Sequence, residues 1–304
     1  MGVGPTRPLR FLYVTNIRRL PDLPLGNIAI YEITDPASPE FIRVFGEGEV
    51  SNPTGMAIRG NILYVANAGG DQTIEVYNIS NPTDPVRLGQ FGGFPELVNP
   101  NALTITGDTL YVTNLLANNV EIYDISNPNP VTPTRVTEFG SVPLVLNAPN
   151  GLAITGNILY ISNAGDATVE IYNIANPFMP ARLGQFGGLA EISHPIGLAI
   201  RGDILYVANF DGINGNTIDV YDISRRNEVP LVLPTNLGQF GAGQLLGPVE
   251  MAITDNILYV VSENDNTVQI YDISNPNPVT PTHLGERSEG LSVPFGLAIF
   301  TLLT

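Results

Sequence analysis

Residues 158–163, ILYISN, decide how this sequence folds, because five other stretches of the chain repeat their design. Each copy carries a Leu-Tyr pair near its start and ends in Asn or Ser; the copies are residues 11–16, 62–67, 109–114, 158–163, 204–209 and 257–262. The successive tyrosines are 51, 47, 49, 46 and 53 residues apart. A unit of this length, repeated six times, is typical of one four-stranded blade of a β-propeller.

The fourth repeat shows the four expected strands most clearly. They are GLAI (151–154), LYISN (159–163), TVEIYNI (168–174) and ARLGQF (181–186), here called strands A to D. A Gly-Asn or Gly-Asp pair joins A to B, which is the signal of a type I′ hairpin. An Asn-Pro turn follows strand C in most repeats, and its proline stops that strand. No segment keeps a 3.6-residue apolar period, so we expect essentially no helix.

The phase of the repeat at the two chain ends predicts how the ring closes. The chain enters at a strand B, FLYVTN, and ends with a surplus strand A at residues 294–299. Pairing these two segments removes open sheet edges. The sequence therefore predicts an all-β, six-bladed propeller of four-stranded blades, formed by residues 1–304 as a single domain and closed by the C-terminal strand A joining the N-terminal blade.

The composition limits the partners of the protein. The net charge is −16 with all 13 basic residues Arg, so we expect neither nucleic acid nor an anionic membrane as a partner. There is no Cys, and hence no disulfide or thiolate metal site. No apolar run approaches the roughly 18 residues that span a bilayer, and the first residues lack the apolar core of a signal peptide.

Comparison of the repeats predicts ion pairs between strands C and D. Glu75, Glu121 and Glu170 occur where the following strand carries Arg87, Arg135 and Arg182. The acid changes to Gln269 where the base is His283, and Asp219 accompanies Asn236. Such pairs across neighbouring strands contribute about 0.2–1 kcal/mol each. We interpret these glutamates as structural and not catalytic.

The repeats resemble known propeller families. YVTN at 13–16 and at 111–114 resembles the YVTN-type β-propeller repeat, and VEIYDISNPNPVTP at 120–133 resembles the LVIVD repeat. The resemblance covers essentially the whole chain. It implies a bacterial-type propeller of the surface or secreted kind, and thus an extracellular or cell-surface location.

The B–C and D–A loops emerge on one face, and they are longer and more variable than the turns on the other. Variable loops on a fixed scaffold favour this face as the binding face. Candidate ligand-binding residues lie where strand A enters the channel: Thr54, Asn101, Asn150, His194 and Glu250. Glu250 stands in a column that is otherwise Gly or Ala. The apolar residues of the D–A loops, Phe94, Leu97, Val142 to Leu146, Leu189, Leu245 and Leu246, are expected to pack over the seams between blades, or to form a protein-binding patch.

Three functions fit these observations. The preferred prediction is a monomeric, non-catalytic propeller without a cofactor that engages a protein or a glycan through the loop-rich face, because no catalytic set of residues is evident. The lack of Trp weakens glycan binding. The first alternative is a calcium-dependent hydrolase of the lactonase or phosphotriesterase kind, with calcium held by Asn101, Asn150 and Glu250. The second is a structural spacer of a larger surface protein.

Overall fold

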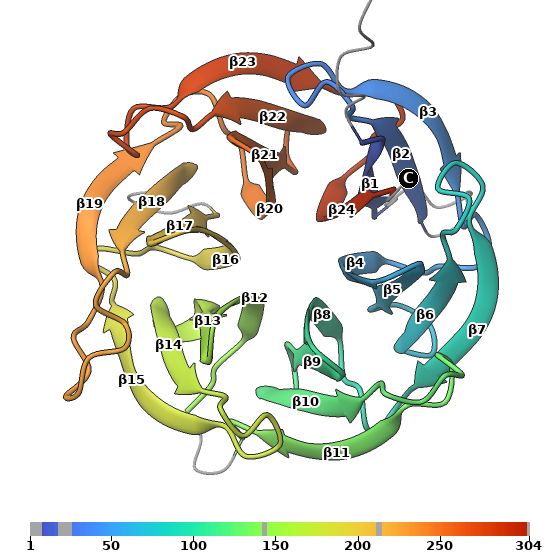
Figure 1. Ribbon diagram of the computed structural model, residues 1–304, viewed down its shortest axis with the longest axis horizontal. Helices are drawn as coiled ribbons and strands as arrows, with labels where there is room; N and C mark the ends of the chain where they lie inside the picture. The colour runs from blue at the N-terminus through green and yellow to red at the C-terminus, as the bar shows by residue number, and fades with distance from the viewer. Residues whose placement is uncertain (1–7, 18–25, 142–144, 211–214, 303–304) are drawn as a thin grey trace, which may run out of the picture.

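Six antiparallel sheets of four strands surround a central channel in the computed structural model (Figure 1). The structure describes residues 8–17, 26–141, 145–210 and 215–302. The six-bladed propeller predicted from the repeats is confirmed.

In each sheet the four strands lie side by side in the order A, B, C, D, from the channel to the outer edge. Blade 1 has β24 (Pro294–Thr301), β1 (Arg10–Asn16), β2 (Asn27–Glu32) and β3 (Glu40–Phe45); blade 2 has β4 (Pro53–Arg59), β5 (Ile62–Asn67), β6 (Thr73–Asn78) and β7 (Val86–Gly92); blade 3 has β8 (Pro100–Thr106), β9 (Thr109–Asn114), β10 (Asn119–Asp124) and β11 (Thr134–Phe139); blade 4 has β12 (Pro149–Thr155), β13 (Ile158–Asn163), β14 (Thr168–Asn173) and β15 (Ala181–Gly187); blade 5 has β16 (Pro195–Arg201), β17 (Ile204–Asn209), β18 (Thr217–Asp222) and β19 (Thr235–Phe240); blade 6 has β20 (Pro248–Thr254), β21 (Ile257–Ser262), β22 (Thr267–Asp272) and β23 (Thr282–Arg287).

The last strand closes the ring as predicted. β24 pairs antiparallel with β1, from Arg10 opposite Thr301 to Asn16 opposite Pro294. Figure 1 shows the red C-terminal strand lying beside the blue N-terminal strands at the channel. The first blade is therefore assembled from the two ends of the chain.

The repeated tyrosines of strand B hold neighbouring blades together. All six are at most 1% exposed. The hydroxyl of Tyr13 donates to the carbonyl of Pro82, 2.8 Å away in the C–D turn of the next blade. Tyr111 donates in the same way to Pro177, at 3.0 Å, and Tyr259 to Pro36, at 2.5 Å. A buried hydroxyl has to find a partner, so the tyrosine and the proline turn are two halves of one inter-blade contact.

Helix is nearly absent, as expected from the sequence. Within the described residues the one helical element is a 3₁₀ turn, η1, at Ala164–Asp166. The described residues contain no helix that is long and apolar enough to cross a membrane. The A–B turns have left-handed backbone at Gly60, Gly107, Gly156 and Gly202, with φ of 56–59°, which agrees with the predicted hairpins.

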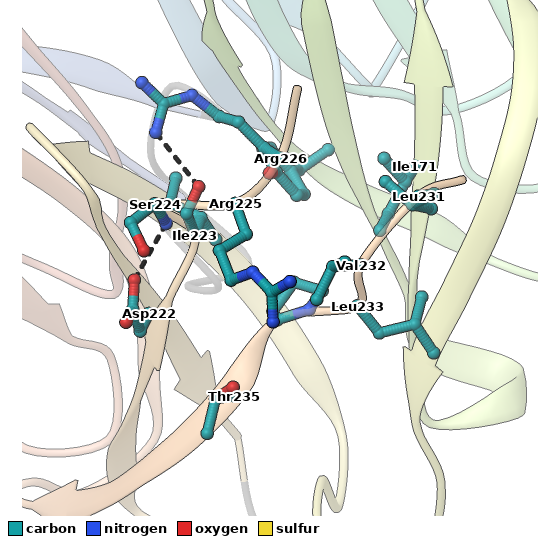
Figure 2. Close-up of a pocket in the computed structure, with 12 residues that line it drawn as sticks. Ile171, Asp222, Ile223, Ser224, Arg225, Arg226, Leu231, Val232, Leu233 and Thr235 are labelled. Atoms are coloured by element: carbon teal, nitrogen blue, oxygen red, sulfur yellow. Dashed lines mark hydrogen bonds between the residues drawn. The ribbon is translucent and has the colours of Figure 1, made fainter. Parts of the chain in front are cut away.

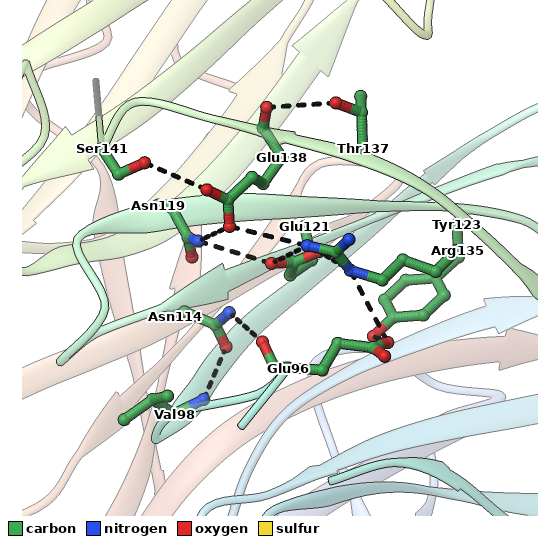
Figure 3. A network of polar contacts seen from close by, with 10 residues as sticks. All are labelled: Glu96, Val98, Asn114, Asn119, Glu121, Tyr123, Arg135, Thr137, Glu138 and Ser141. Atoms are coloured by element: carbon green, nitrogen blue, oxygen red, sulfur yellow. Dashed lines mark hydrogen bonds and ion pairs between the residues drawn. The ribbon is translucent and has the colours of Figure 1, made fainter. Parts of the chain in front are cut away.

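Three of the predicted ion pairs on the outer strands are confirmed. Arg87, Arg135 and Arg182 each place a guanidinium nitrogen 2.7 Å from the carboxylate of Glu75, Glu121 and Glu170, which are 1% exposed. In blade 3 the pair belongs to a larger network with Asn119 and Glu138 (Figure 3). Burial raises the pKa of Glu121 to about 7, although the Arg135 guanidinium opposes this. In blade 6 the neutral replacement also pairs, since His283 Nε2 lies 2.7 Å from Gln269 Oε1.

The prediction for blade 5 is wrong. Asn236 does not bond to Asp219; its side-chain amide lies 3.3 Å from the Tyr221 hydroxyl. Asp219 instead accepts a hydrogen bond of 2.7 Å from Asn209 on strand B. The aspartate is one methylene shorter than the glutamates, so its carboxylate stays close to its own strand and does not reach the outer strand.

Deletion of residues 294–304 should open the ring, because it removes β24, the partner of β1 on the channel side, and leaves only β2 paired with β1. We expect a lower melting temperature and aggregation at the exposed edge of β1, measured by scanning calorimetry and light scattering. Deletion of residues 303–304 alone is the control. A monomeric 294–304 deletion variant with an unchanged melting temperature would contradict the closure.

Arg182→Gln should lower the free energy of unfolding by about 2–4 kcal/mol at pH 8, because it leaves Glu170 buried without a cation. The loss is below that of a wholly buried pair, since Arg182 is 40% exposed. The double variant Glu170→Gln/Arg182→His copies the natural pair of blade 6 and should stay near wild type in urea unfolding. Equal losses in the two variants would show that the charge pair is not what holds these strands.

Candidate functional site

Each inner strand carries a β-bulge where it enters the channel. After the first proline of the strand, two residues stand opposite one residue of strand B. The bulged pairs are Thr54–Gly55, Asn101–Ala102, Asn150–Gly151, Ile196–Gly197, Val249–Glu250 and Phe295–Gly296. Bulges at the rim of a closed sheet redirect side chains and are common beside active sites. These twelve residues form the channel mouth.

The second position of the bulge is crowded by the next blade. A Cβ on Gly55, Gly151, Gly197 or Gly296 would lie 2.1–2.5 Å from a carbonyl oxygen of the neighbouring inner strand. Only a very small residue fits such a gap, which explains the Gly and Ala of this column. Glu250 is the one member with a polar side chain, so the contact between β20 and β24 has to accommodate a carboxylate.

Glu250 lies in the apolar half of the mouth. Val249, Val261, Ile196 and Leu297 belong to one buried cluster, and Phe295 packs against it. The side chain of Glu250 is half-buried, and its one hydrogen bond within the described residues is accepted from the Met251 backbone N–H, at 3.0 Å. Loss of water around the carboxylate raises the pKa of Glu250 to about 7, against the smaller effect of that hydrogen bond.

The other half of the mouth is polar. Asn101 Nδ2 donates to Asn150 Oδ1 at 2.8 Å, across the seam between blades 3 and 4. Thr54 Oγ1 donates to the Pro100 carbonyl at 2.9 Å, across the preceding seam. All three side chains are 5–6% exposed. Blade 3 and blade 6 lie on opposite sides of the channel (Figure 1), so β8, which carries Asn101, is across the channel from β20, which carries Glu250.

Hydroxyls on strand B anchor the bulges, and sequence reasoning missed them. Thr113 Oγ1 accepts from the Ala102 N–H and donates to the Asn150 carbonyl, both at 2.8 Å. Ser162 and Thr15 occupy the same position in blades 4 and 1 and make the same contacts. In blade 6 this position is Val261, which has no hydroxyl to bond to the bulge and belongs to a buried apolar cluster. The sequence could have revealed these hydroxyls, because each stands at the fifth position of the repeated phrase.

Amide side chains clamp neighbouring loops around the mouth. Asn118 Oδ1 accepts from the Ala148 N–H at 2.8 Å, and Asn266 Oδ1 accepts from the Val293 N–H at 2.6 Å. Ala148 and Val293 have left-handed backbone, which a β-branched residue adopts only under constraint. In blade 4 the position that corresponds to Asn118 and Asn266 is Ala167, which has no side-chain acceptor for the N–H of His194.

His194 stands apart from the other candidates. Its side chain is exposed, and its ring contacts Phe210 edge-on with 6.0 Å between ring centres. The structure therefore brings Asn101 and Asn150 together and places Thr54 in the adjoining seam. It sets Glu250 opposite them and leaves His194 on the rim.

The residues of the mouth do not fit a calcium ion. Asn150 Oδ1 is already bonded to the Asn101 amide, and Glu250 belongs to the opposite side of the ring. No group of three or more His, Asp or Glu residues gathers for a metal in the described part of the chain. Calcium takes about 6–8 oxygen ligands, and the mouth offers it one carboxylate and, on the opposite side of the channel, two amide oxygens.

Two other sites are weaker candidates. Figure 2 shows a cavity beside the C–D loop of blade 5, lined by Arg225, Arg226 and Leu231 among others. Its volume of about 20 Å³ admits about one water molecule. The second candidate is Asp219, which is 1% exposed and whose pKa is raised to about 6 by burial. Its carboxylate accepts a hydrogen bond from Asn209, in the interior of the blade. Neither place offers room for a substrate.

The apolar residues of the D–A loops divide into two groups. Leu97, Leu146 and Leu245 are fully buried under the loops, which confirms packing over the seams for these three. Phe94, Leu189 and Leu246 are 74%, 79% and 51% exposed. Residues 142–144 lie outside the described residues.

Solved structures of propeller lactonases are similar to this chain over nearly its whole length. A putative 6-phosphogluconolactonase from Bacteroides fragilis matches with a TM-score of 0.66 and 14% identity, covering 98% of this chain and 100% of that one. The periplasmic gluconolactonase PpgL of Pseudomonas aeruginosa matches with a TM-score of 0.67 and 14% identity, covering 95% and 85%. A putative 6-phosphogluconolactonase from Bacteroides uniformis matches with a TM-score of 0.64 and 11% identity, covering 97% and 100%. At these identities the likeness shows the fold.

No family model matches the sequence, and neither does any curated protein. The preferred prediction of a non-catalytic propeller that engages a protein or a glycan is wrong in the light of three of the similar structures, which are named as lactonases. They favour the first alternative. The repeats carry no recognisable catalytic motif, which is why the sequence favoured a non-catalytic function.

Asp219→Asn should remove a pH-dependent loss of stability. The folded protein holds the Asp219 proton more tightly than the unfolded chain does, so ionisation lowers the free energy of unfolding as the pH rises from about 4 through 6. The variant should be about 3 kcal/mol more stable than wild type at pH 8 and nearly equal at pH 4, measured by urea unfolding. A variant less stable than wild type at pH 8 would contradict this account.

Proposed function

We propose that the chain is a lactone hydrolase with its active site at the channel mouth and Glu250 as its acid–base group. The observation that carries this proposal is the position of Glu250. It is the single carboxylate in a column of Gly and Ala, in the half of the mouth where the neighbouring bulge residues are apolar, and desolvation raises its pKa to about 7. A group with a pKa near the working pH is the most effective general base and acid. The names of the similar structures add support.

The hydrolysis would use residues from both halves of the mouth. The Glu250 carboxylate accepts a proton from water as the water oxygen bonds to the lactone carbonyl carbon. The ring C–O bond then breaks, and Glu250 returns the proton to the departing alkoxide oxygen. Asn101 and Asn150, on the other side of the channel, would bind hydroxyl groups of the lactone, because each amide nitrogen carries two N–H groups.

No step of this proposal depends on calcium, because the donor set does not fit that ion. We also infer a location outside the cytoplasm. The support for it is that one of the similar structures is described as periplasmic, together with the resemblance of the repeats to those of surface or secreted proteins.

Glu250→Gln should lower kcat/KM for glucono-1,5-lactone by about 100-fold or more, because an amide cannot accept the proton from water. Proton release at several enzyme concentrations, corrected for spontaneous hydrolysis, measures the rate. In the wild type, kcat/KM should rise with pH and level off above about 7, as Glu250 becomes ionised. The variant should lack this transition.

Two further variants separate catalysis from folding. Glu250→Gly restores the residue type of the column, so it should fold as wild type and still lose activity. Glu40→Gln changes an exposed carboxylate on the outer strand β3 and should keep full activity. Wild-type turnover in Glu250→Gln, or wild-type turnover that is abolished by a calcium chelator, would overturn the proposal.

A further inference from the structure

The face that surrounds the channel mouth is acidic. Nine acidic residues occupy the described parts of the B–C and D–A loops: Glu47, Glu49, Asp71, Glu96, Asp166, Glu191, Glu263, Asp265 and Glu289. The described parts of these loops contain no arginine. Arg18 and Arg19 belong to the B–C loop of blade 1 and lie outside the described residues.

The described arginines are engaged elsewhere. Arg59, Arg201 and Arg226 bond to residues of the A–B turns, on the opposite face. Others, such as Arg87 and Arg135, pair with buried glutamates on the outer strands. Arg287 directly precedes the D–A loop of blade 6, but it donates to the carbonyl oxygens of Pro39 and Glu286, at 2.9 Å and 2.8 Å.

The channel itself also lacks a cation in its described lining. Beyond the bulges, a cavity of about 320 Å³ follows the inner strands β4, β8, β20 and β24. Its lining residues are all uncharged; Met56, Leu103, Ile253 and Leu297 are among them. Each inner strand is paired on one side alone, so its free backbone N–H and C=O groups face the channel and require hydrogen-bonding partners.

We propose that the site selects neutral, hydroxyl-bearing lactones and discriminates against phosphorylated ones. This inference rests on the proposed function. Hydroxyl groups of a sugar lactone can satisfy the free backbone groups of the inner strands. A phosphate would enter an acidic field, because the net charge of the chain is −16, and it would find no described arginine to bind it. The similar structures bear the names of both kinds of lactonase, so the names alone do not decide.

The test compares two substrates that differ by one phosphate. We expect kcat/KM for glucono-1,5-lactone to exceed that for 6-phosphoglucono-1,5-lactone by about 10-fold or more at 0.01 M ionic strength. The ratio of the two kcat/KM values should fall at 0.15 M ionic strength, because the Debye length falls from about 30 Å to about 8 Å and the repulsion is screened. The neutral lactone should be hydrolysed at the same rate at both ionic strengths.

Charge variants show whether the acidic face is the cause. The triple variant Asp71→Asn/Glu191→Gln/Glu289→Gln removes three exposed carboxylates from this face and should raise kcat/KM for the phosphorylated lactone alone. The matched control, Glu40→Gln/Asp84→Asn/Glu228→Gln, removes three exposed carboxylates away from the mouth and should change neither substrate.

The outcomes separate the two proposals. If neither lactone is hydrolysed above the spontaneous rate, the proposed function is overturned, and this inference with it. If the phosphorylated lactone is hydrolysed as fast as the neutral one or faster, the selectivity is overturned while the hydrolase stands. A preference for the neutral lactone that is independent of salt and of the triple variant would overturn the acidic face as its origin.

Discussion

The close approach of the six inner strands is the constraint on which this molecule depends. At the second position of four of the six bulges the backbone of the next blade comes so near that a Cβ on the glycine there would overlap a carbonyl oxygen. The ring therefore closes at a fixed diameter, and the backbone of one blade limits the side chains of its neighbour. A carboxylate in such a column has an energetic cost, because it is removed from water without a counter-ion. Glu250 therefore occupies a position at which the packing favours a small, uncharged residue.

The same ring explains why polar and apolar residues separate around the channel. In blades 1, 3 and 4 a hydroxyl on strand B bonds both to the bulge of its own blade and to the next blade. In blades 5 and 6 aliphatic residues take over, and Ile196, Val249 and Val261 join one core cluster. A repeat of one design thus produces a mouth with two unlike sides.

Most of the fold was predictable because the repeated phrase has a direct physical meaning. The tyrosine of strand B and the proline turn of the next blade form one contact, so their joint recurrence already implied six adjoining blades. The ion pair of Glu121 with Arg135 could be read from matched changes between repeats, but the blade 5 pair could not. There the shorter Asp219 turns to Asn209 of its own sheet, a choice that depends on side-chain length and not on the pattern.

The candidate site was predictable in its position and not in its chemistry. The column of glycines singled out Glu250, and the residues beside the prolines singled out Asn101 and Asn150. Nothing in the sequence around Glu250 predicts a raised pKa, because Val261 comes from the next strand of the same blade and Phe295 from the last strand, which belongs to the neighbouring blade. His194 was selected as a rare residue type, and the structure leaves it exposed on the rim.

The pairing of β24 with β1 also has a consequence for biosynthesis. Residues 294–301 are synthesised after the other strands of the ring, yet they complete the blade that contains β1. Until β24 is in place the inner edge of β1 has no partner, and the β20–β24 contact beside Glu250 does not exist. The catalytic geometry proposed for this carboxylate thus arises only after all six blades have been synthesised.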